Sequence, residues 1–161
     1  MWWATSAQPN KEVLELLLSR YAKAQIDAVD TTKYSALHHL CMHRNLANKD
    51  AQWVVEKLIS KKAKMTQAAG WDKHTPLGLA AMRGDAALVE AMVEFVPRLN
   101  LNKGDKFGRT PILMASRNGH ANIVALLMKH HAKADIPDTS GNTPLHYAAA
   151  YGWLDCIHVL L

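Results

Sequence analysis

The most informative segment of the sequence reads Asp138-Thr139-Ser140-Gly141-Asn142-Thr143-Pro144-Leu145-His146-Tyr147-Ala148-Ala149-Ala150-Tyr151-Gly152. Gly141 suits a tight turn with positive φ because it carries no Cβ. Thr143 can cap a helix with its hydroxyl, and Pro144 fits the first helical position, where the missing amide hydrogen would have no partner. Small and apolar residues follow at helical spacing, and Gly152 can end the helix. The stretch therefore predicts a turn, a short capped helix and a stop.

The same pattern occurs twice more upstream, around Thr110-Pro111 and around Thr75-Pro76. The threonines are 33 residues apart in one case (143 − 110) and 35 in the other (110 − 75). A turn followed by two helices at a period of about 33 residues, with Thr-Pro-Leu-His-x-Ala, is typical of ankyrin repeats. The chain therefore resembles the ankyrin-repeat family. The resemblance implies an all-α solenoid of stacked helix-turn-helix units joined by β-turn or hairpin loops.

The repeat period divides the chain into one ankyrin-repeat domain over residues 1–161. We expect its units at 1–29 (a partial repeat), 30–69, 70–104, 105–137 and 138–161 (a truncated repeat). In the partial repeat, Trp2 and Trp3 either shield the end of the core or mark a cut. The second unit carries an insertion at 43–51, which either lengthens the loop between its helices or extends a helix. The last helix ends at an apolar Leu160-Leu161 pair, so we expect either a fragment of a longer protein or a chain that is ordered only to this point.

Composition excludes several classes of protein. The longest apolar runs fall well short of the roughly 18 residues that span a membrane, so no membrane insertion is predicted. The formal net charge is +5, but no Lys/Arg run is long enough to predict nucleic-acid binding. Cys41 and Cys156 fall on apolar helix positions in different repeats, which favours buried free thiols. We therefore expect an intracellular protein of the cytoplasm or nucleus.

The nine histidines raise the question of a metal or catalytic site. His38, His39, Cys41 and His43 lie close together, but the first two point about 100° apart on a helix, and no second cluster completes a tetrahedral set. The resemblance implies instead that the motif histidines, His38 and His146, brace the loops near the turn. No catalytic constellation or phosphate loop stands out. We predict no enzyme, cofactor, metal or small-molecule substrate.

The resemblance implies a binding surface at the turn tips and the exposed ends of the first helices. Carried onto this sequence, it predicts the partner-binding residues Tyr34, Met42, His43, Trp71, His74, Met82, Arg83, Phe107, Arg109, Arg117, Asn118, Asn142 and Tyr151. Trp, Tyr and Arg are enriched at binding hot spots. We therefore predict a protein-interaction scaffold, monomeric in isolation, that binds a partner protein or peptide on a concave surface. The alternative is a regulatory or targeting domain of a larger enzyme or membrane channel.

Overall fold

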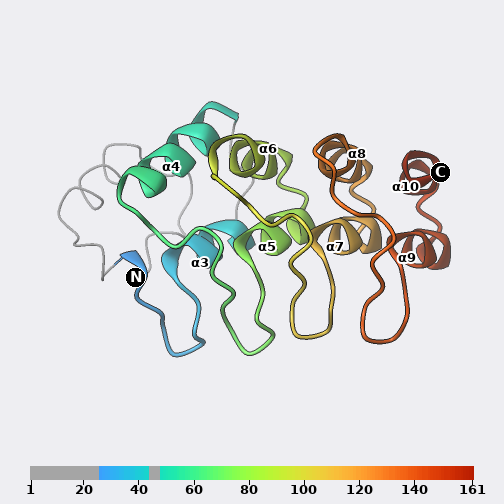
Figure 1. Cartoon of the computed structure of the whole chain (residues 1–161), viewed down its shortest axis with the longest axis horizontal. Coiled ribbons are helices and arrows are strands. Elements are labelled where there is room, and N and C mark those ends of the chain that lie inside the picture. The colour runs from blue at the N-terminus through green and yellow to red at the C-terminus, as the bar shows by residue number, and fades with distance from the viewer. Residues whose placement is uncertain (1–25, 44–47) are drawn as a thin grey trace.

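Helices in two parallel rows make up the structure, a computed structural model that describes residues 26–43 and 48–161 (Figure 1). The expected partial repeat, with Trp2 and Trp3, lies almost wholly outside the described residues. One row, the inner helices, comprises α3 (Ala36–His43), α5 (Pro76–Arg83), α7 (Pro111–Arg117) and α9 (Pro144–Tyr151). The other row, the outer helices, comprises α4 (Asn48–Ser60), α6 (Ala86–Phe95), α8 (Ala121–Lys129) and α10 (Leu154–Leu160). Long loops connect each outer helix to the next inner one, and their tips extend beyond the inner row.

The regular inner helices begin as their sequence predicts, and α5 and α9 also end at the predicted glycine. The Thr75 hydroxyl accepts a hydrogen bond from the Gly78 N–H at 3.0 Å, and Thr110 accepts one from Leu113 at 3.4 Å. A proline follows each of these caps at the first helical position. Gly84 and Gly152 end α5 and α9 at φ values of 81° and 72°. These positive values favour glycine because it has no Cβ to clash with the backbone.

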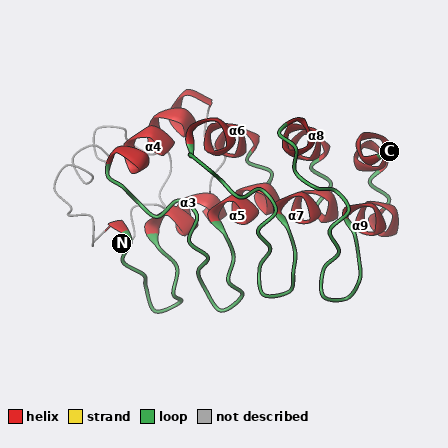
Figure 2. Cartoon of the chain, viewed as in Figure 1, coloured by secondary structure: helices red, strands yellow, loops and turns green. Residues whose placement is uncertain are grey.

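An aspartate holds each of the hairpin-like turns that precede α7 and α9. Asp105 Oδ1 accepts hydrogen bonds from the Phe107 and Arg109 N–H groups at 2.9 and 3.0 Å. Asp138 does the same for Ser140 and Asn142, also at 2.9 and 3.0 Å. In the described residues these loops carry isolated β-bridges and no named strand, so helices and loops account for the fold (Figure 2). The predicted all-α solenoid is confirmed.

Small residues let the inner helices pack closely against one another. Ala80, Ala81, Ala115 and Ala148 are fully buried, and so is Ser116, whose hydroxyl donates to the Ile112 carbonyl at 2.9 Å. The outer helices contribute larger buried side chains, namely Val54, Val55, Leu58, Leu88, Val89, Met92, Ile123, Val124 and Leu127. Each unit is too small to bury these groups alone, so neighbouring units cover them.

The insertion in the second unit contributes to a helix. α4 has 13 residues, whereas α6 has 10 and α8 has 9. It begins at Asn48, inside the segment 43–51, so part of the extra length lies in this helix. Residues 44–47 are outside the described part of the chain.

The histidines His38 and His146 form hydrogen bonds with residues of the turns. His38 contacts the Ser35 hydroxyl at 2.7 Å and the Gln67 carbonyl oxygen of the following loop at 3.0 Å. Burial lowers the pKa of His38 to about 4, so its ring is neutral at physiological pH. His146 bonds the hydroxyl of Thr143 at 2.8 Å. The prediction that these two histidines brace the turns is confirmed.

Candidate partner-binding surface

Two aromatic side chains stand exposed at the tips of adjacent loops. Trp71 is 69% exposed, and Phe107 is 40% exposed. The Lys33 Nζ atom lies 4.6 Å from the centroid of the Trp71 ring. Phe107 lies close to two cations, with Arg109 Cζ at 4.5 Å from the ring centroid and Lys106 Nζ at 4.8 Å. These cation–π contacts hold large apolar surfaces in place without burying them.

The carboxylates of the tips are already occupied by local partners. Asp72 forms an ion pair with Lys106, and the Arg109 Nε atom donates to Asp105 at 2.8 Å. The hydrogen bond from Lys106 lowers the pKa of Asp72, which keeps that carboxylate ionised. Backbone hydrogen bonds also join neighbouring tips, from Lys106 N–H to the Asp72 carbonyl and from Thr139 N–H to the Phe107 carbonyl, each at 2.9 Å. The tips therefore form one connected row.

His74, a residue of the predicted binding set, is buried and does not form part of the exposed surface of the tips. It is only 8% exposed, and its Nδ1 and Nε2 atoms lie 3.5 Å from Asp105 Oδ2 and 3.7 Å from Asp72 Oδ2. Its Nδ1 atom has no hydrogen-bond partner among the described residues. Burial lowers the pKa of His74, although the charge of Asp105 acts in the opposite sense. His74 therefore lies beneath the exposed tips, close to the carboxylates of Asp72 and Asp105.

The Tyr34 side chain packs against Gly70 of the neighbouring loop and against His38 of α3. It is half-buried, and a Cβ added to Gly70 would lie 2.2 Å from the Cζ atom of the Tyr34 ring. The ring centroid is 5.8 Å from that of His38. Gly70 thus provides the space that Tyr34 fills, and this side chain offers only part of its surface to a partner.

The ends of the inner helices supply the other predicted residues. Arg83 ends α5 and is exposed, and Arg117 ends α7 with its Cζ atom 5.5 Å from the centroid of the Tyr147 ring. Tyr147 in turn stacks on Tyr151, with centroids 6.3 Å apart and planes inclined by 7°. Met82 is half-buried against the core. Cations, aromatic rings and a flexible thioether therefore occupy these ends.

The remaining predicted residues offer a partner less exposed or less available surface, and one side chain lies outside the described part of the chain. Asn118 is exposed, but its amide donates to the Met114 carbonyl at 2.8 Å. Met42 and Asn142 are half-buried, and Arg109 is half-buried by its ion pair with Asp105. His43 ends α3, and its side chain is outside the described part.

Sequence reasoning missed Tyr147 as a member of this surface. Its hydroxyl donates to Asp138 Oδ2 at 2.8 Å, and its ring contacts both Arg117 and Tyr151. Tyr147 and Tyr151 are four residues apart on α9, and this spacing places two side chains on one helix face. This spacing in the sequence could have predicted that Tyr147 lies beside Tyr151.

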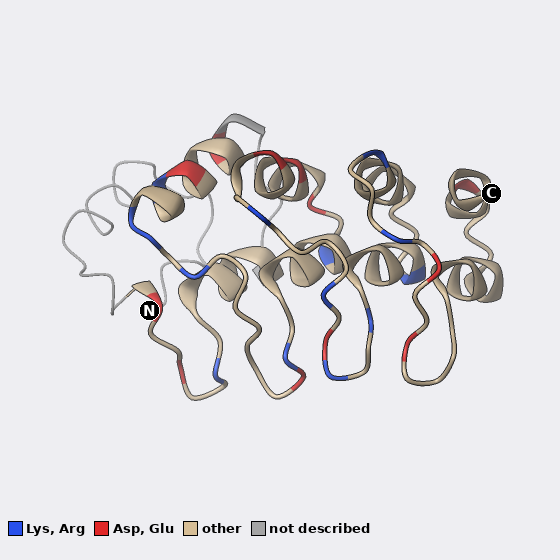
Figure 3. Ribbon diagram, in the orientation of Figure 1, with Lys and Arg blue, Asp and Glu red and all other residues tan. Residues whose placement is uncertain are grey.

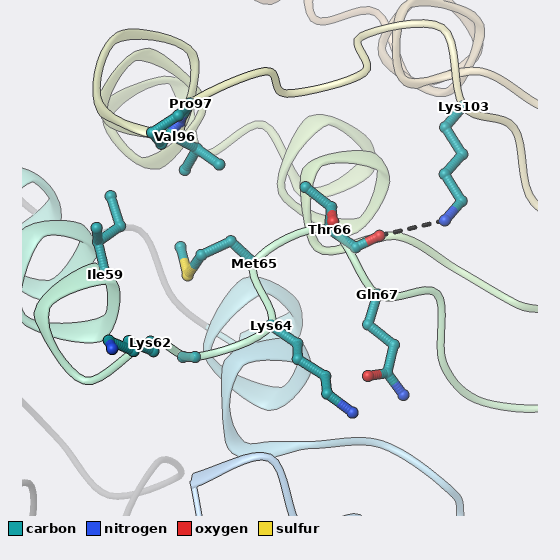
Figure 4. Close-up of a pocket in the computed structure, with 10 residues that line it drawn as sticks. Ile59, Lys62, Lys64, Met65, Thr66, Gln67, Val96, Pro97 and Lys103 are labelled. Carbon is teal, nitrogen blue, oxygen red and sulfur yellow. Dashed lines mark hydrogen bonds between the residues drawn. The ribbon is translucent and has the colours of Figure 1, made fainter. Parts of the chain in front are cut away.

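A basic groove of about 560 Å³ lies elsewhere on the molecule, between the ends of two outer helices (Figure 4). It is lined by Ile59, Lys62, Ala63, Lys64, Met65, Thr66, Gln67, Val96, Pro97 and Lys103. The Lys103 Nζ atom donates to the Thr66 carbonyl at 3.3 Å and so joins the two loops that form the groove. Sequence did not predict this groove because its walls come from two separate loops, which meet where Lys103 contacts Thr66, 37 residues away.

Within residues 26–43 and 48–161, no helix is long and apolar enough to cross a membrane. Cys41 and Cys156 are buried free thiols, as the sequence predicted. Burial raises the pKa of both thiols, so they stay protonated at neutral pH.

Two rows of helices with projecting loops define the class of protein: an α-solenoid of stacked helix-turn-helix repeats. Residues 92–161 match the family described as ankyrin repeats in three copies. The chain belongs to the ankyrin-repeat family, whose repeats are a general protein-interaction module and generally non-catalytic.

The chain is similar to parts of several much longer curated proteins. It is 35% identical over 91 residues to "Transient receptor potential cation channel subfamily A member 1" of Homo sapiens, a match that covers 56% of this chain and 8% of the relative. It is 33% identical over 101 residues to "Target of rapamycin complex 2 subunit AVO2" of Saccharomyces cerevisiae, covering 57% and 24%. It is 33% identical over 144 residues to "Inversin" of Canis lupus familiaris, covering 86% and 12%. The match thus spans at most about a quarter of the length of any of these relatives.

Proposed function

We propose that this chain binds a partner protein or peptide on a surface made of its loop tips and the ends of its inner helices. This binding surface consists of Met42, Trp71, Met82, Arg83, Phe107, Arg117, Asn118, Tyr147 and Tyr151. The observation that carries the proposal is the exposure of Trp71 and Phe107 on neighbouring tips. Neither side chain packs against the hydrophobic core, so neither is needed for stacking. Burying such a ring against a partner is favourable, and aromatic residues dominate binding hot spots.

The surface is also well suited to bind without a large ordering cost. The tips are joined to one another through backbone hydrogen bonds, and each tip is fixed by hydrogen bonds within its own turn. Preformed surfaces lose little conformational entropy on association, so more of the contact energy appears as affinity. The exposed rings are held by cations from the same or the preceding loop, which fixes their orientation further.

Affinity capture from a cell extract, quantified by mass spectrometry, tests the proposal. The double variant Trp71→Ala/Phe107→Ala removes both rings. The control variant Glu90→Ala/Lys129→Ala changes two exposed residues of outer helices and leaves the net charge unchanged. We expect a defined set of proteins that the wild type and the control retain and the tip variant loses. A tip variant that retains every protein captured by the wild type would refute the proposed surface. Circular dichroism of all three proteins verifies that each remains folded.

A second candidate is that this module serves a regulatory or targeting role inside a larger polypeptide, such as an enzyme or a membrane channel. The similarity to a cation channel, of which the matched region covers 8%, favours this possibility. Sequencing the complete transcript tests it. A membrane-spanning or catalytic region in the same reading frame would support this candidate, and a complete reading frame consisting of ankyrin repeats alone would contradict it.

A further inference from the structure

We propose that the partner presents an acidic peptide segment, whose carboxylates are bound by Arg83 and Arg117. This inference rests on the proposed function and specifies the chemistry of the ligand. It starts from the distribution of charge between the two helical rows. None of the four inner helices contains an aspartate or a glutamate, as Figure 3 shows for the helices of the inner row. The outer helices carry Asp50, Glu56, Glu90, Glu94 and Asp155.

The two arginines lack acidic partners within the described structure. The side chain of Arg83 is exposed and forms no ion pair or hydrogen bond with a described residue. The guanidinium of Arg117 contacts the Tyr147 ring and likewise has no carboxylate partner in the described part. A guanidinium presents a planar fork of N–H donors that matches a carboxylate. Both groups therefore keep their full donor capacity for a ligand.

The acidic residues of the tips do not compensate for these charges. Asp105 is bound by Arg109, and Asp72 by Lys106. Asp138 accepts two backbone N–H groups and the Tyr147 hydroxyl, while Asp30 accepts hydrogen bonds from Thr32 and His39. Each of these carboxylates already has a local donor. Arg83 and Arg117 are the only Lys or Arg residues of the four described inner helices, and no acidic residue of these helices balances their charge.

The spacing of the two arginines suits an extended peptide. They occupy equivalent places, as the last residues of neighbouring helices α5 and α7. Packed helix axes lie about 8–10 Å apart. Side chains two residues apart on an extended strand project from the same face about 7 Å apart. Arginine side chains are long enough to absorb the difference, so acidic residues at alternate positions could engage both guanidinium groups.

The surroundings of Arg117 favour a peptide over a nucleic acid. Its guanidinium lies over Tyr147, which stacks on Tyr151, so the fork is held in place before a ligand arrives. Met82 adjoins Arg83, and its thioether can adapt to apolar side chains of a peptide. Binding of a nucleic acid draws on several phosphate contacts, commonly about 6–10. Two arginines among aromatic and thioether groups match an acidic peptide with apolar residues instead.

Selection from a library of random short peptides on the whole chain tests the inference. The enriched peptides are then synthesised with a fluorescent label, once as selected and once with each Glu and Asp replaced by Gln and Asn. The variant Arg83→Gln/Arg117→Gln removes the proposed ligands. The variant Lys62→Gln/Lys64→Gln removes the same charge from the basic groove and is the matched control.

We expect peptides rich in Asp and Glu that bind about tenfold more weakly to the arginine variant, since two partly exposed charge pairs are lost. The affinity of the acidic peptides for the lysine variant should stay within about twofold of their affinity for the wild type. The peptides with Gln and Asn in place of Glu and Asp should bind the wild type as weakly as the acidic peptides bind the arginine variant. Enriched peptides without acidic residues, or acidic peptides that depend on the lysines instead, would overturn the inference. So would a single-stranded oligonucleotide that displaces the peptide and binds more tightly through the arginines. If the selected peptides are not acidic and no longer bind the variant Trp71→Ala/Phe107→Ala, the inference fails but the proposed function holds. If the selected peptides bind both the tip variant and the arginine variant as tightly as wild type, the proposed function is contradicted too.

Discussion

The indole Nε1 atom of Trp153 donates a hydrogen bond to the carbonyl oxygen of Arg117 at 3.1 Å, across 36 residues of sequence. His120 contacts the Met82 carbonyl oxygen in the same way at 3.2 Å, one repeat earlier. Each ring covers a glycine of the preceding repeat, because a Cβ at Gly119 would lie 2.7 Å from Trp153, and one at Gly84 would lie 2.6 Å from His120. A ring that closes over the end of the preceding inner helix is therefore a device that joins successive repeats.

Trp153→Ala should destabilise the fold by about 1–3 kcal/mol, because it removes both the ring contact and the hydrogen bond. Trp153→Phe keeps an aromatic ring and loses the N–H donor, so its cost should be smaller, about 0.5–1.5 kcal/mol. Urea unfolding followed by circular dichroism measures both. Equal stability of wild type and the alanine variant would show that this contact does not join the repeats.

Ala115→Leu should destabilise the protein by about 1–3 kcal/mol, because Ala115 is fully buried between inner helices and the larger side chain would overpack the site. Ala125→Leu is the matched control, since Ala125 is exposed on α8 and its replacement should change little. Thermal melting of the two variants makes the comparison. An unshifted midpoint for Ala115→Leu would be inconsistent with this packing.

Lys73→Gly should stabilise the protein by up to about 1 kcal/mol. Lys73 has φ 54°, at the place in its turn where the neighbouring loops have Gly108 at 74° and Gly141 at 81°. A left-handed conformation costs a residue with a Cβ roughly 1–2 kcal/mol, and glycine avoids this cost. Glycine also raises the chain entropy of the unfolded state, which offsets part of the gain. The reverse change, Gly108→Ala, should destabilise. A lower unfolding free energy for Lys73→Gly would contradict this account of the turn.

Stability should fall as the pH is lowered from about 6.5 to about 4, owing to His38. Its folded pKa of about 4 lies below the ordinary value of 6.5, so the unfolded state binds the proton more readily. The stabilisation is therefore complete above about pH 6.5 and is lost as the pH falls through the folded pKa, with a total of about 3 kcal/mol. His74 adds to the loss in the same direction.

Urea unfolding at a series of pH values checks this, with His38→Gln as the comparison. The variant has a lower stability at pH 7, because glutamine cannot reproduce both ring hydrogen bonds, but its stability should change less between pH 6.5 and 4. Parallel pH profiles for wild type and variant would argue against the neutral, buried His38 as the cause.

The regular features of this fold are encoded locally, which is why the sequence predicts them. A threonine cap, a proline and a terminal glycine lie within about ten residues of one another in each regular inner helix, and each acts on its own backbone. The same holds for the turn aspartates, whose carboxylates bond N–H groups two and four residues ahead. Such signals need no knowledge of the neighbouring repeat.

Features that depend on contacts between repeats escaped prediction. His74 was assigned to the binding surface from its place in the motif, but Asp105 of the next loop packs against it and buries it. The basic groove likewise depends on Lys103 reaching Thr66 of the preceding loop. Tyr147 contacts Asp138, which lies in the turn before its helix, and Arg117, which lies in the preceding repeat. The pattern of one repeat does not contain these neighbours.

Site-specific photo-crosslinking measures whether the partner contacts the loop tips. A photoreactive phenylalanine analogue is placed at Phe107, on an exposed loop tip, and in a second protein at Ala125, on the exposed side of an outer helix. Each protein is irradiated with a captured partner at the same concentration. Binding at the loop tips predicts a crosslinked complex from position 107 and none from position 125. Crosslinking from position 125 alone would contradict it, because the partner would then lie on the outer helices and not on the loop tips.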